Sequence, residues 1–574
     1  MSYQQQEQAV LTWVLEHALR FLQKRILWII LGLLMAWAFL LRCLHLLNPD
    51  RYYLLGPDSH FFHWLAQRVM AGEGPPPDIR EGAIYTIHSG LAYPLAYIAQ
   101  AVSSIFNVPS ADALELVSKF LPPTLGIISL VIVYLAATRI YDRRVGFFAA
   151  LAWALMLHAL FLGAGGLIDR DGLNTFLIML GLFLFYFSQY WHIRVRNKNA
   201  GWIVAGLGVL LIEGLLYLQW SVVGSLLLLV PIVVYFVVKL LLKIFSRTGT
   251  EVSAKLRIAA ALNEVNWQTL ALIIVGNVLV AAAFYHQASS WFGFLTDLVS
   301  YGRGSPVSEL HGIVARDLTV YHFFLIPLVL GLYLAWRKRS NGSIFIACWF
   351  LLFLVLSLFA KRILFLAAPA ACLFVGAGLA YIWDWAKAGQ LRLLKRVGVA
   401  ALLLLMVLVS FITAASIGAD RAMSADKEWQ DALTYLREET PQDSVIITQW
   451  SWGFWILDLG QRKPLVDNGF YGYPAEKLHD VGLVYTASDP SEAARIMKKY
   501  DADYIIFSAL DLDVAKYIME WAGLGEGHDA FSTDSMVARS LTNEFQSGGG
   551  LEVVYRSSPD SEVVILGLTQ SGQP

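Results

Sequence analysis

The chain has 574 residues, of which 57% are hydrophobic and only 15% are charged, and its mean hydropathy is +0.56. This composition excludes an ordinary soluble globular protein and predicts a polytopic membrane protein. The formal net charge is −1, and the basic residues are dispersed among short loops, so a nucleic-acid partner is not expected.

Several apolar stretches are long enough to cross a hydrocarbon core of about 30 Å. They lie near residues 26–46, 119–139, 145–164, 173–191, 200–217, 218–242, 268–286, 320–336, 343–360, 362–384 and 396–416. The pair between 200 and 242 is the least distinct. We therefore predict a helical transmembrane domain of 11 to 13 spans over residues 1–420.

Basic residues lie at alternate ends of these stretches, as the positive-inside rule requires. With a cytoplasmic N-terminus, the basic clusters at 139–144, 194–198, 239–247, 337–339 and 387–396 all face the cytoplasm. The other side then receives the loops 48–118, 165–172 and 287–319 and everything after residue 417. We predict a multi-pass protein of the plasma or inner membrane whose C-terminal domain is extracytoplasmic, that is, periplasmic.

Four carboxylates that lie in otherwise apolar sequence fall in these three extracytoplasmic loops, namely those of Asp58, Asp169, Asp171 and Glu309. Asp169 and Asp171 flank Arg170 in a short loop, where two acids repel each other unless a cation lies between them. Mg²⁺ and Mn²⁺ are the divalent ions that prefer such oxygen ligands. For an isolated pair, the alternative is a solvated polar turn in which Arg170 pairs with one neighbour.

The other candidate residues also have two interpretations each. Asp58 precedes an aromatic-rich amphipathic helix, so it is either a site residue or a helix N-cap, and His60 and His63 in that helix are predicted to be interfacial and not ligands. Glu309 lies in a long loop with glycine on one flank, which is typical of a mobile lid. Arg362 begins a span on the same side, either as a snorkelling topology anchor or as a phosphate ligand at headgroup depth.

From about residue 425 the charge rises and the long apolar runs stop, which predicts a soluble α/β domain over residues 425–574. Strands are predicted at 444–448, 503–507 and 552–555, and helices at 428–438 and 491–499. The stretch 523–550, rich in Gly, Ser and Asp, predicts a loop, and the last dozen residues are predicted to be disordered.

Taken in order, these residues resemble a known family, the STT3-like catalytic subunits of oligosaccharyltransferase, which are GT-C membrane glycosyltransferases. Asp58 falls at the family's first-loop aspartate, and Asp169-Arg170-Asp171 at its second acidic motif. Ser308-Glu309 resembles the family's loop motif, and Arg362 with Pro369 resembles its arginine-to-proline span opening. In the α/β domain, residues 449–456 with 464–469 are similar to the Trp-Trp-Asp-Tyr-Gly block and its downstream strand, and Asp513 to Lys516 is similar to the Asp-x-x-Lys motif.

The resemblance implies an inverting, metal-dependent oligosaccharyltransferase that moves a glycan from a polyprenyl (di)phosphate donor to an asparagine of an acceptor polypeptide. It implies a single subunit working among membrane lipids. It further implies Mn²⁺ or Mg²⁺ held by Asp58, Asp169, Asp171 and Glu309, with Asp58 and Glu309 also accepting hydrogen bonds from the acceptor amide. Arg362 would bind the donor phosphate, and the acceptor would be bound by Trp450, Ser451, Trp452, Asp513 and Lys516.

The chain departs from the family pattern at four positions, one of which is the apolar residue Met519, which falls one position early in the motif of Asp513 to Lys516. Gln449 and Ser451 stand where the Trp-Trp-Asp-Tyr-Gly block has a tryptophan and the aspartate. A hydroxyl accepts a hydrogen bond more weakly than a carboxylate, so the acceptor specificity stays open. Leu162 stands where family members can carry a basic residue.

Three other functions and one structural alternative remain at this point. The nearest is a GT-C glycosyltransferase with the same class of lipid donor but a hydroxyl or lipid-linked acceptor. A transporter would carry its acids at mid-span, whereas these acids lie in predicted loops. A non-catalytic scaffold would keep its function without Asp169 and Glu309. An ordinary aromatic core is the alternative for the tryptophan-rich block.

Overall fold

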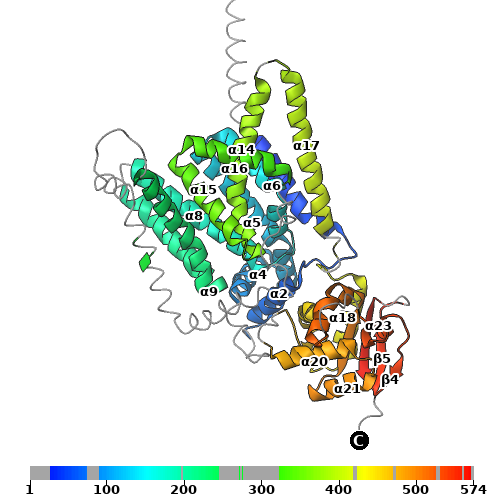
Figure 1. The fold of residues 1–574 in the computed structure, drawn as a ribbon. Coiled ribbons are helices and arrows are strands. Elements are labelled where there is room, and N and C mark those ends of the chain that lie inside the picture. Colours follow the sequence, from blue (N-terminus) through cyan, green and yellow to red (C-terminus); the bar gives the residue numbers. More distant parts are fainter. Residues whose placement is uncertain are drawn as a thin grey trace, which may run out of the picture.

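The computed structural model describes residues 26, 28–73, 89–194, 198–244, 271, 274–275, 322–388, 390–417, 420, 423–468, 473–524, 531–558 and 562–569. A helical part comes first in the chain and an α/β unit follows it. Figure 1 shows the α/β unit, coloured yellow to red, at one end of the helical part and close to α2. The predicted loop 287–319, with Glu309, lies outside the described residues.

The helical part begins with the helix Trp28–Leu47, whose last turn is η1 (Leu44–Leu47). Its further elements are α2 (Pro57–Met70), η2 (Ser89–Leu91), α4 (Ala92–Phe106), α5 (Ser110–Ile140), α6 (Arg143–Leu155), α7 (Leu157–Leu162), α8 (Arg170–Arg194), α9 (Lys198–Ile244), α14 (His322–Lys338), α15 (Asn341–Leu356), η5 (Lys361–Ile363), α16 (Leu364–Lys387) and α17 (Arg392–Ile417). Within the described residues, five helices are long and apolar enough to cross a membrane, which supports a multi-pass membrane protein.

The element α9 is helical over its whole length but consists of two segments that run in opposite directions. A Cβ atom on Gly181 of α8 would lie 3.3 Å from Ile212 and 2.9 Å from Leu228, both of which belong to α9. In a straight helix these two residues would be about 24 Å apart. A Cβ atom on Gly224 would also lie 2.7 Å from the carbonyl oxygen of Leu216. The stretches predicted at 200–217 and 218–242 are therefore two helical segments that reverse direction near Leu216.

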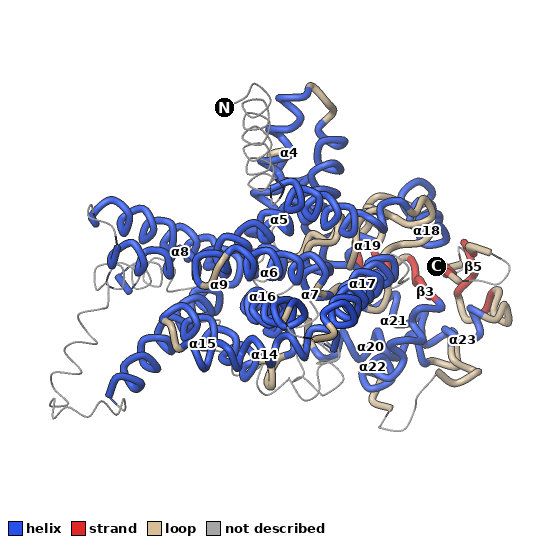
Figure 2. Tube along the Cα trace, turned by 90° about the horizontal axis from the view of Figure 1, so that it is seen from above, coloured by secondary structure: helices blue, strands red, loops and turns tan. Residues whose placement is uncertain are grey.

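Helix α16 lies in the middle of the helical part, with α6, α14, α15 and α17 around it (Figure 2). In the most apolar stretch of the span that contains α16, 89% of the residues are buried inside the protein, against 22% for α17. Two glycines permit this packing, because a Cβ atom on Gly376 would lie 2.6 Å from Ala149 N of α6, and one on Gly378 would lie 2.0 Å from Pro327 O of α14. The tight packing fixes the position of η5, which begins this span.

The α/β unit contains a six-stranded sheet with the order β2-β1-β3-β6-β5-β4. The strands are β1 (Val445–Ile447), β2 (Lys463–Pro464), β3 (Tyr504–Ser508), β4 (Ser547–Gly548), β5 (Leu551–Arg556) and β6 (Val563–Leu568), and β1 pairs in parallel with β2 and β3 while the other pairs are antiparallel. The helices are α18 (Lys427–Glu439), α19 (Gly453–Asp458), α20 (Ala475–Thr486), α21 (Pro490–Lys499), α22 (Ala515–Trp521) and α23 (Met536–Leu541), with η6 (Trp450–Trp452) and η8 (Ala509–Val514).

Successive residues of the central strand β3 point to opposite faces of the sheet. Ile505 and Phe507 belong to the hydrophobic cluster that includes α20 to α23, whereas Ile506 belongs to the cluster that includes α18 and α19. The sheet is therefore covered by helices on both faces. Trp452 and Trp455 of the tryptophan-rich block lie on the face with α18 and α19, whereas Trp450 belongs to the cluster with α20 to α23.

The predicted strands at 444–448, 503–507 and 552–555 are confirmed as β1, β3 and β5, and the two predicted helices as α18 and α21. The prediction of disorder for the last dozen residues was wrong over β6, which pairs with both β3 and β5 and buries Val563 to Leu566. The prediction of a loop over 523–550 was wrong at α23 and β4. In both cases pairing and packing with distant segments outweighed the local composition.

Candidate active site

Two segments that carry predicted acids cross each other at the end of the helical part. Leu55 N donates to Gly166 O at 3.0 Å, and Gly166 N donates to Lys119 O at 3.3 Å. Next to this crossing, Ile168 N donates to the Ser59 hydroxyl oxygen at 2.9 Å. These bonds join the start of α2 to the residues just before α8, and so bring Asp58 and Asp169 to one place.

Asp58 lies in the first turn of α2, and its side chain does not cap the helix. The N-cap residue is Gly56, and the cap has no side-chain hydrogen bond, so the N-cap interpretation of Asp58 is wrong. Burial raises the pKa of Asp58, and the nearby charge of Asp169 raises it further. From the α/β unit, Asn468 Nδ2 donates to Asp58 Oδ1 at 3.3 Å. Asp58 is therefore linked both to the second acidic motif and to the α/β unit.

The second acidic motif is joined to the start of the central span. Arg362 in η5 donates from Nε to Asp171 Oδ2 at 2.5 Å, and its Nη2 lies 3.7 Å from Asp169 Oδ2. The Asp171 side chain is only 5% exposed, and that of Arg362 is 23% exposed. Arg362 is therefore held by both carboxylates at the edge of the site, and part of its side chain is exposed to solvent.

The chemistry of the acids fits a hard divalent cation, although the described residues supply only part of a ligand set. Asp58 and Asp169 offer oxygen ligands. The nearby charges of Arg170 and Arg362 partly offset the repulsion between them, and a divalent cation would relieve it further. Asp171, predicted as a third ligand, already pairs with Arg362. Glu309, the predicted fourth ligand, lies outside the described residues, and among those described no group of three or more His, Cys, Asp or Glu is placed to hold a metal ion.

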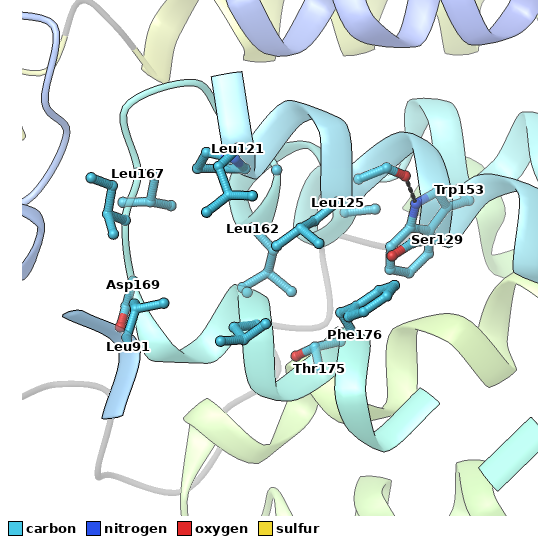
Figure 3. A pocket seen from close by; sticks show the side chains of 17 residues that line it. Leu91, Leu121, Leu125, Ser129, Trp153, Leu162, Leu167, Asp169, Thr175 and Phe176 are labelled. Carbon is cyan, nitrogen blue, oxygen red and sulfur yellow. Dashed lines mark hydrogen bonds between the residues drawn. The ribbon is translucent and has the colours of Figure 1, made fainter. Parts of the chain in front are cut away.

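A mostly apolar pocket adjoins Asp169, with a volume of about 30 Å³, between α5, α7 and α8. Figure 3 shows Asp169 and Leu91 at one end of it and Trp153 and Ser129 at the other. Leu162, which stands where family members can carry a basic residue, lines this pocket. Leu162 therefore contributes an apolar wall to the pocket. Arg362 is a cation that contacts the acidic motif from η5.

In the α/β unit, the two tryptophans predicted to bind the acceptor are buried. Trp450 packs against Trp521 of α22, with a ring-centroid distance of 4.6 Å. The Trp452 indole donates to Asp511 Oδ1 at 2.7 Å. Ser451 between them is half-buried, and its N–H donates to Gln449 Oε1 at 2.7 Å. Gln449 thus stabilises the turn that presents Ser451, and the tryptophans hold that turn on the core.

The predicted acceptor residues Asp513 and Lys516 are both exposed to solvent. Lys516 lies in α22, whose Tyr517 contacts the ring of Trp450 at a centroid distance of 6.3 Å. The packing of α22 on the tryptophan-rich block therefore brings this motif to the same part of the α/β unit as Ser451.

Two contacts between the α/β unit and α2 were not predicted from the sequence. Asp458, the last residue of α19, accepts from His60 Nδ1 at 2.7 Å and from His63 Nδ1 at 3.0 Å. The second is the bond from Asn468 to Asp58. His60 and His63, predicted to be interfacial, are both buried and both contact α19 through Asp458. A lone aspartate ending an apolar, aromatic run was the available signal for Asp458.

The raised pKa of Asp511 predicts that the stability of the protein depends on pH. Burial raises its pKa to about 7, although Trp452 and the Ser508 N–H donate to its oxygens. Because the folded-state pKa lies above the unfolded value, the contribution of Asp511 to stability is fully present below about pH 4. This contribution, a few kcal/mol at most, is lost as the pH rises through about 7. The melting temperature of the wild type minus that of Asp511→Asn should therefore decrease between about pH 5 and about pH 8. A difference that is independent of pH would contradict the prediction.

The chain is similar to known proteins in sequence and in fold. No protein-family model matches the chain. Dolichyl-phosphooligosaccharide-protein glycotransferase 3 of Archaeoglobus fulgidus is 22% identical over 554 residues, which cover 74% of this chain and 62% of that protein. Subunit STT3B of the dolichyl-diphosphooligosaccharide–protein glycosyltransferase of Oryza sativa is 21% identical, covering 40% of this chain and 34% of that protein. The chain thus spans less than two thirds of the length of these relatives.

Solved structures share the fold. The apo oligosaccharyltransferase of Archaeoglobus fulgidus has a TM-score of 0.70 at 15% identity, covering 93% of this chain and 80% of that one. ArnT of Cupriavidus metallidurans has a TM-score of 0.54 at 12% identity, covering 95% and 99%. The helical part and the α/β unit therefore share the fold of these structures, and the sequence similarity to the glycotransferases above confirms the resemblance to the STT3-like family.

Proposed function

We propose that this chain, a member of the STT3-like family by sequence similarity and fold, is an oligosaccharyltransferase that moves a glycan from a polyprenyl (di)phosphate to an asparagine of an acceptor polypeptide. The observation that carries the proposal is the meeting of Asp58, Asp169 and Arg362 at the junction between the helical part and the α/β unit. Structures of the Archaeoglobus fulgidus enzyme were solved with an inhibitory peptide and a dolichol-phosphate, and with a tethered peptide containing the Asn-Val-Thr sequon, which supports both substrate classes.

The donor phosphate would lie between the acids and Arg362. Asp58, Asp169 and Glu309 would hold Mn²⁺ or Mg²⁺, which when bound neutralises the charge that develops on the leaving phosphate. Arg362 supplies a second, fixed cation, and its bond to Asp171 orients the guanidinium toward the site. This assigns Asp171 an orienting contact with Arg362 beside its predicted role as a ligand. A structure of the Archaeoglobus fulgidus enzyme with Zn and sulfate supports a cation and an anion in such a site.

The acceptor asparagine would be activated by Asp58 and Glu309. An amide nitrogen is a poor nucleophile because its lone pair is delocalised into the carbonyl group. Carboxylates that accept both N–H hydrogens weaken this delocalisation. The nitrogen then attacks the sugar carbon with inversion, the bond from that carbon to the phosphate oxygen breaks, and one amide proton passes to a carboxylate. Loop 287–319 would close over the bound acceptor.

Acceptor recognition falls to Ser451, Trp450, Trp452, Asp513 and Lys516 in a domain that we assign to residues 425–574. The tryptophans fix the turn, and Ser451 is the side chain that remains accessible on it. Since its hydroxyl is a weaker acceptor than the carboxylate of the family block, we expect weaker discrimination between acceptors with and without a hydroxyl two residues after the asparagine.

The proposal includes the membrane arrangement. Residues 1–420 form 11 to 13 spans, the N-terminus is cytoplasmic and the α/β domain is periplasmic, and the enzyme works as a single subunit in the plasma or inner membrane. The donor then reaches the site from the outer leaflet, which is where Asp58, Asp169 and Glu309 would lie.

A transfer assay tests the function and its metal dependence together. Purified protein is incubated with a lipid-linked glycan and a peptide carrying Asn-x-Thr, with the Gln-x-Thr peptide as the matched control. Only the first peptide should be glycosylated. Chelation of divalent ions should slow transfer by about a thousandfold, because metal stabilisation of the leaving group is worth several kcal/mol, and added Mn²⁺ or Mg²⁺ should restore it. Equal rates with and without chelator would contradict the metal site.

The nearest alternative is a GT-C glycosyltransferase with a hydroxyl or lipid-linked acceptor. The replacement of the block's aspartate by Ser451 is the observation that favours it. A hydroxyl-bearing lipid acceptor, offered with the same donor, separates the two functions. Product with this acceptor and none with the Asn-x-Thr peptide would replace the proposed function by the alternative.

A further inference from the structure

A carboxylate clamped by two imidazoles joins the α/β unit to α2. Asp458 Oδ2 accepts from His60 and Asp458 Oδ1 accepts from His63, and the side chains of Asp458 and His60 are 1% and 0% exposed. Burial alone would raise the pKa of Asp458, but the two imidazoles outweigh it and lower the pKa to about 2. Asp458 is therefore a buried carboxylate anion that is stable in this position because both of its oxygens are paired.

The surrounding contacts make this clamp specific in geometry. The His63 ring is fixed at its other nitrogen, because His63 Nε2 lies 3.1 Å from the Tyr53 hydroxyl. The rings of Phe61 and Phe454 pack at a centroid distance of 4.9 Å beside the clamp. Thus α19 contacts α2 through directional hydrogen bonds as well as through apolar surface, and the two helices have one defined relative position.

The two helices carry the two halves of the proposed chemistry. Asp58 lies in the first turn of α2, two residues before His60. Helix α19 continues directly from η6, which carries Ser451. Asn468, from the same α/β unit, adds a bond to Asp58 itself. A shift of α19 along α2 would therefore move the acceptor-binding turn relative to the carboxylate that is proposed to accept from the amide.

We propose that Asp458 is a positioning residue, which through His60 and His63 sets the acceptor-binding block at the correct distance from Asp58. This inference rests on the proposed function. It predicts an effect on turnover of the acceptor with no effect on donor binding, because Arg362, Asp169 and Asp171 are all held by the helical part. A misplacement of about 1 Å is enough to lower turnover by about a hundredfold.

The test uses the full-length protein and five variants. Asp458→Leu removes both acceptors at similar side-chain volume, and Asp458→Asn keeps one of them. His63→Gln, alone and combined with Asp458→Leu, completes a double-mutant cycle. Asp480→Leu is the matched control, because Asp480 is a similarly buried carboxylate of the α/β unit that accepts from Lys499 at 2.6 Å and from Tyr500 at 2.7 Å.

The expected result is that Asp458→Leu lowers kcat for the Asn-x-Thr peptide between about tenfold and about a hundredfold, while KM for the lipid donor is unchanged. Asp458→Asn should recover part of this loss. His63→Gln should lower kcat in the wild-type background and have no further effect in Asp458→Leu, because the residues act as one unit. Asp480→Leu should keep kcat. The inference is overturned if Asp458→Leu keeps kcat, if the two effects multiply, or if Asp480→Leu loses as much.

Hydrogen exchange separates this inference from the proposed function. Asp458→Leu should increase amide exchange in α2 and α19, and Asp480→Leu should leave α2 unchanged. If the wild type transfers no glycan, the proposed function fails, and exchange alone then decides whether Asp458 fixes α2. If exchange in α2 is unchanged in Asp458→Leu, Asp458 does not fix α2, whatever the activity of the variant. The exchange measurement also applies if that variant is too inactive to assay.

Discussion

Asp58→Asn is expected to lower kcat/KM for glycan transfer by at least about a thousandfold. The substitution removes one of the three carboxylate charges that meet around Arg362, and it removes the acceptor proposed for the substrate amide. An asparagine oxygen can still accept from Asn468, so the bond between α2 and the α/β unit is kept and the fold is preserved. Initial rates at saturating donor, together with the melting temperature of each protein, measure the two effects separately.

The matched control for this prediction is Asp50→Asn. Asp50 precedes the same helix by a few residues but is exposed to solvent. Removing its charge should leave kcat/KM within a factor of about two, because exposed charges are screened by water and salt. If Asp58→Asn retains more than about a tenth of the wild-type rate, the metal site and the amide contact assigned to Asp58 are both wrong.

Hydropathy predicted much of the helical part because membrane spans have a minimum length and a uniform apolar composition. It could not predict that α16 lies in the middle of the helices, since all the spans are similarly apolar in sequence. The position of α16 depends on close backbone contacts at Gly376 and Gly378, and the identity of a neighbouring backbone is not encoded in a local window.

The approach of Asp58 to Asp169 followed from topology, because loops on one side of a membrane share one surface. The specific pairs did not follow. Arg362 and Asp171 are separated by 191 residues, and His60 and Asp458 by 398. Such pairs form only once the helices have a defined relative position, so a single sequence gives their residue types but not their partners.

Strand β6 illustrates the same limit in the α/β unit. Val563 to Leu566 is a short apolar run near the chain end, where disorder is common. It is ordered because β3 and β5 offer backbone partners on both sides. The tryptophan-rich block is a further example, because the structure assigns Trp450 and Trp452 to the core and leaves Ser451 accessible between them.

Gly166→Ala is expected to lower kcat/KM for transfer by about a hundredfold or more and to lower the melting temperature. Gly166 lies where the segment before α2 crosses the loop that carries Asp169. A Cβ atom on Gly166 would lie 1.8 Å from Tyr53 O, and the backbone φ is +70°, a conformation that disfavours alanine. The two segments must separate to admit the methyl group, and Asp58 then moves away from Asp169.

Gly72→Ala isolates the effect of the overlap from that of the backbone conformation. Gly72 follows α2 with a similar φ of +77°, but a Cβ atom there would meet nothing within 4 Å. Gly72→Ala should therefore lower the free energy of unfolding by about 1 kcal/mol through backbone strain alone and leave kcat/KM unchanged. If the two alanine variants lose activity to the same extent, strain or general destabilisation explains the loss. If only Gly166→Ala loses activity, the distance between the two acidic segments is what the reaction requires.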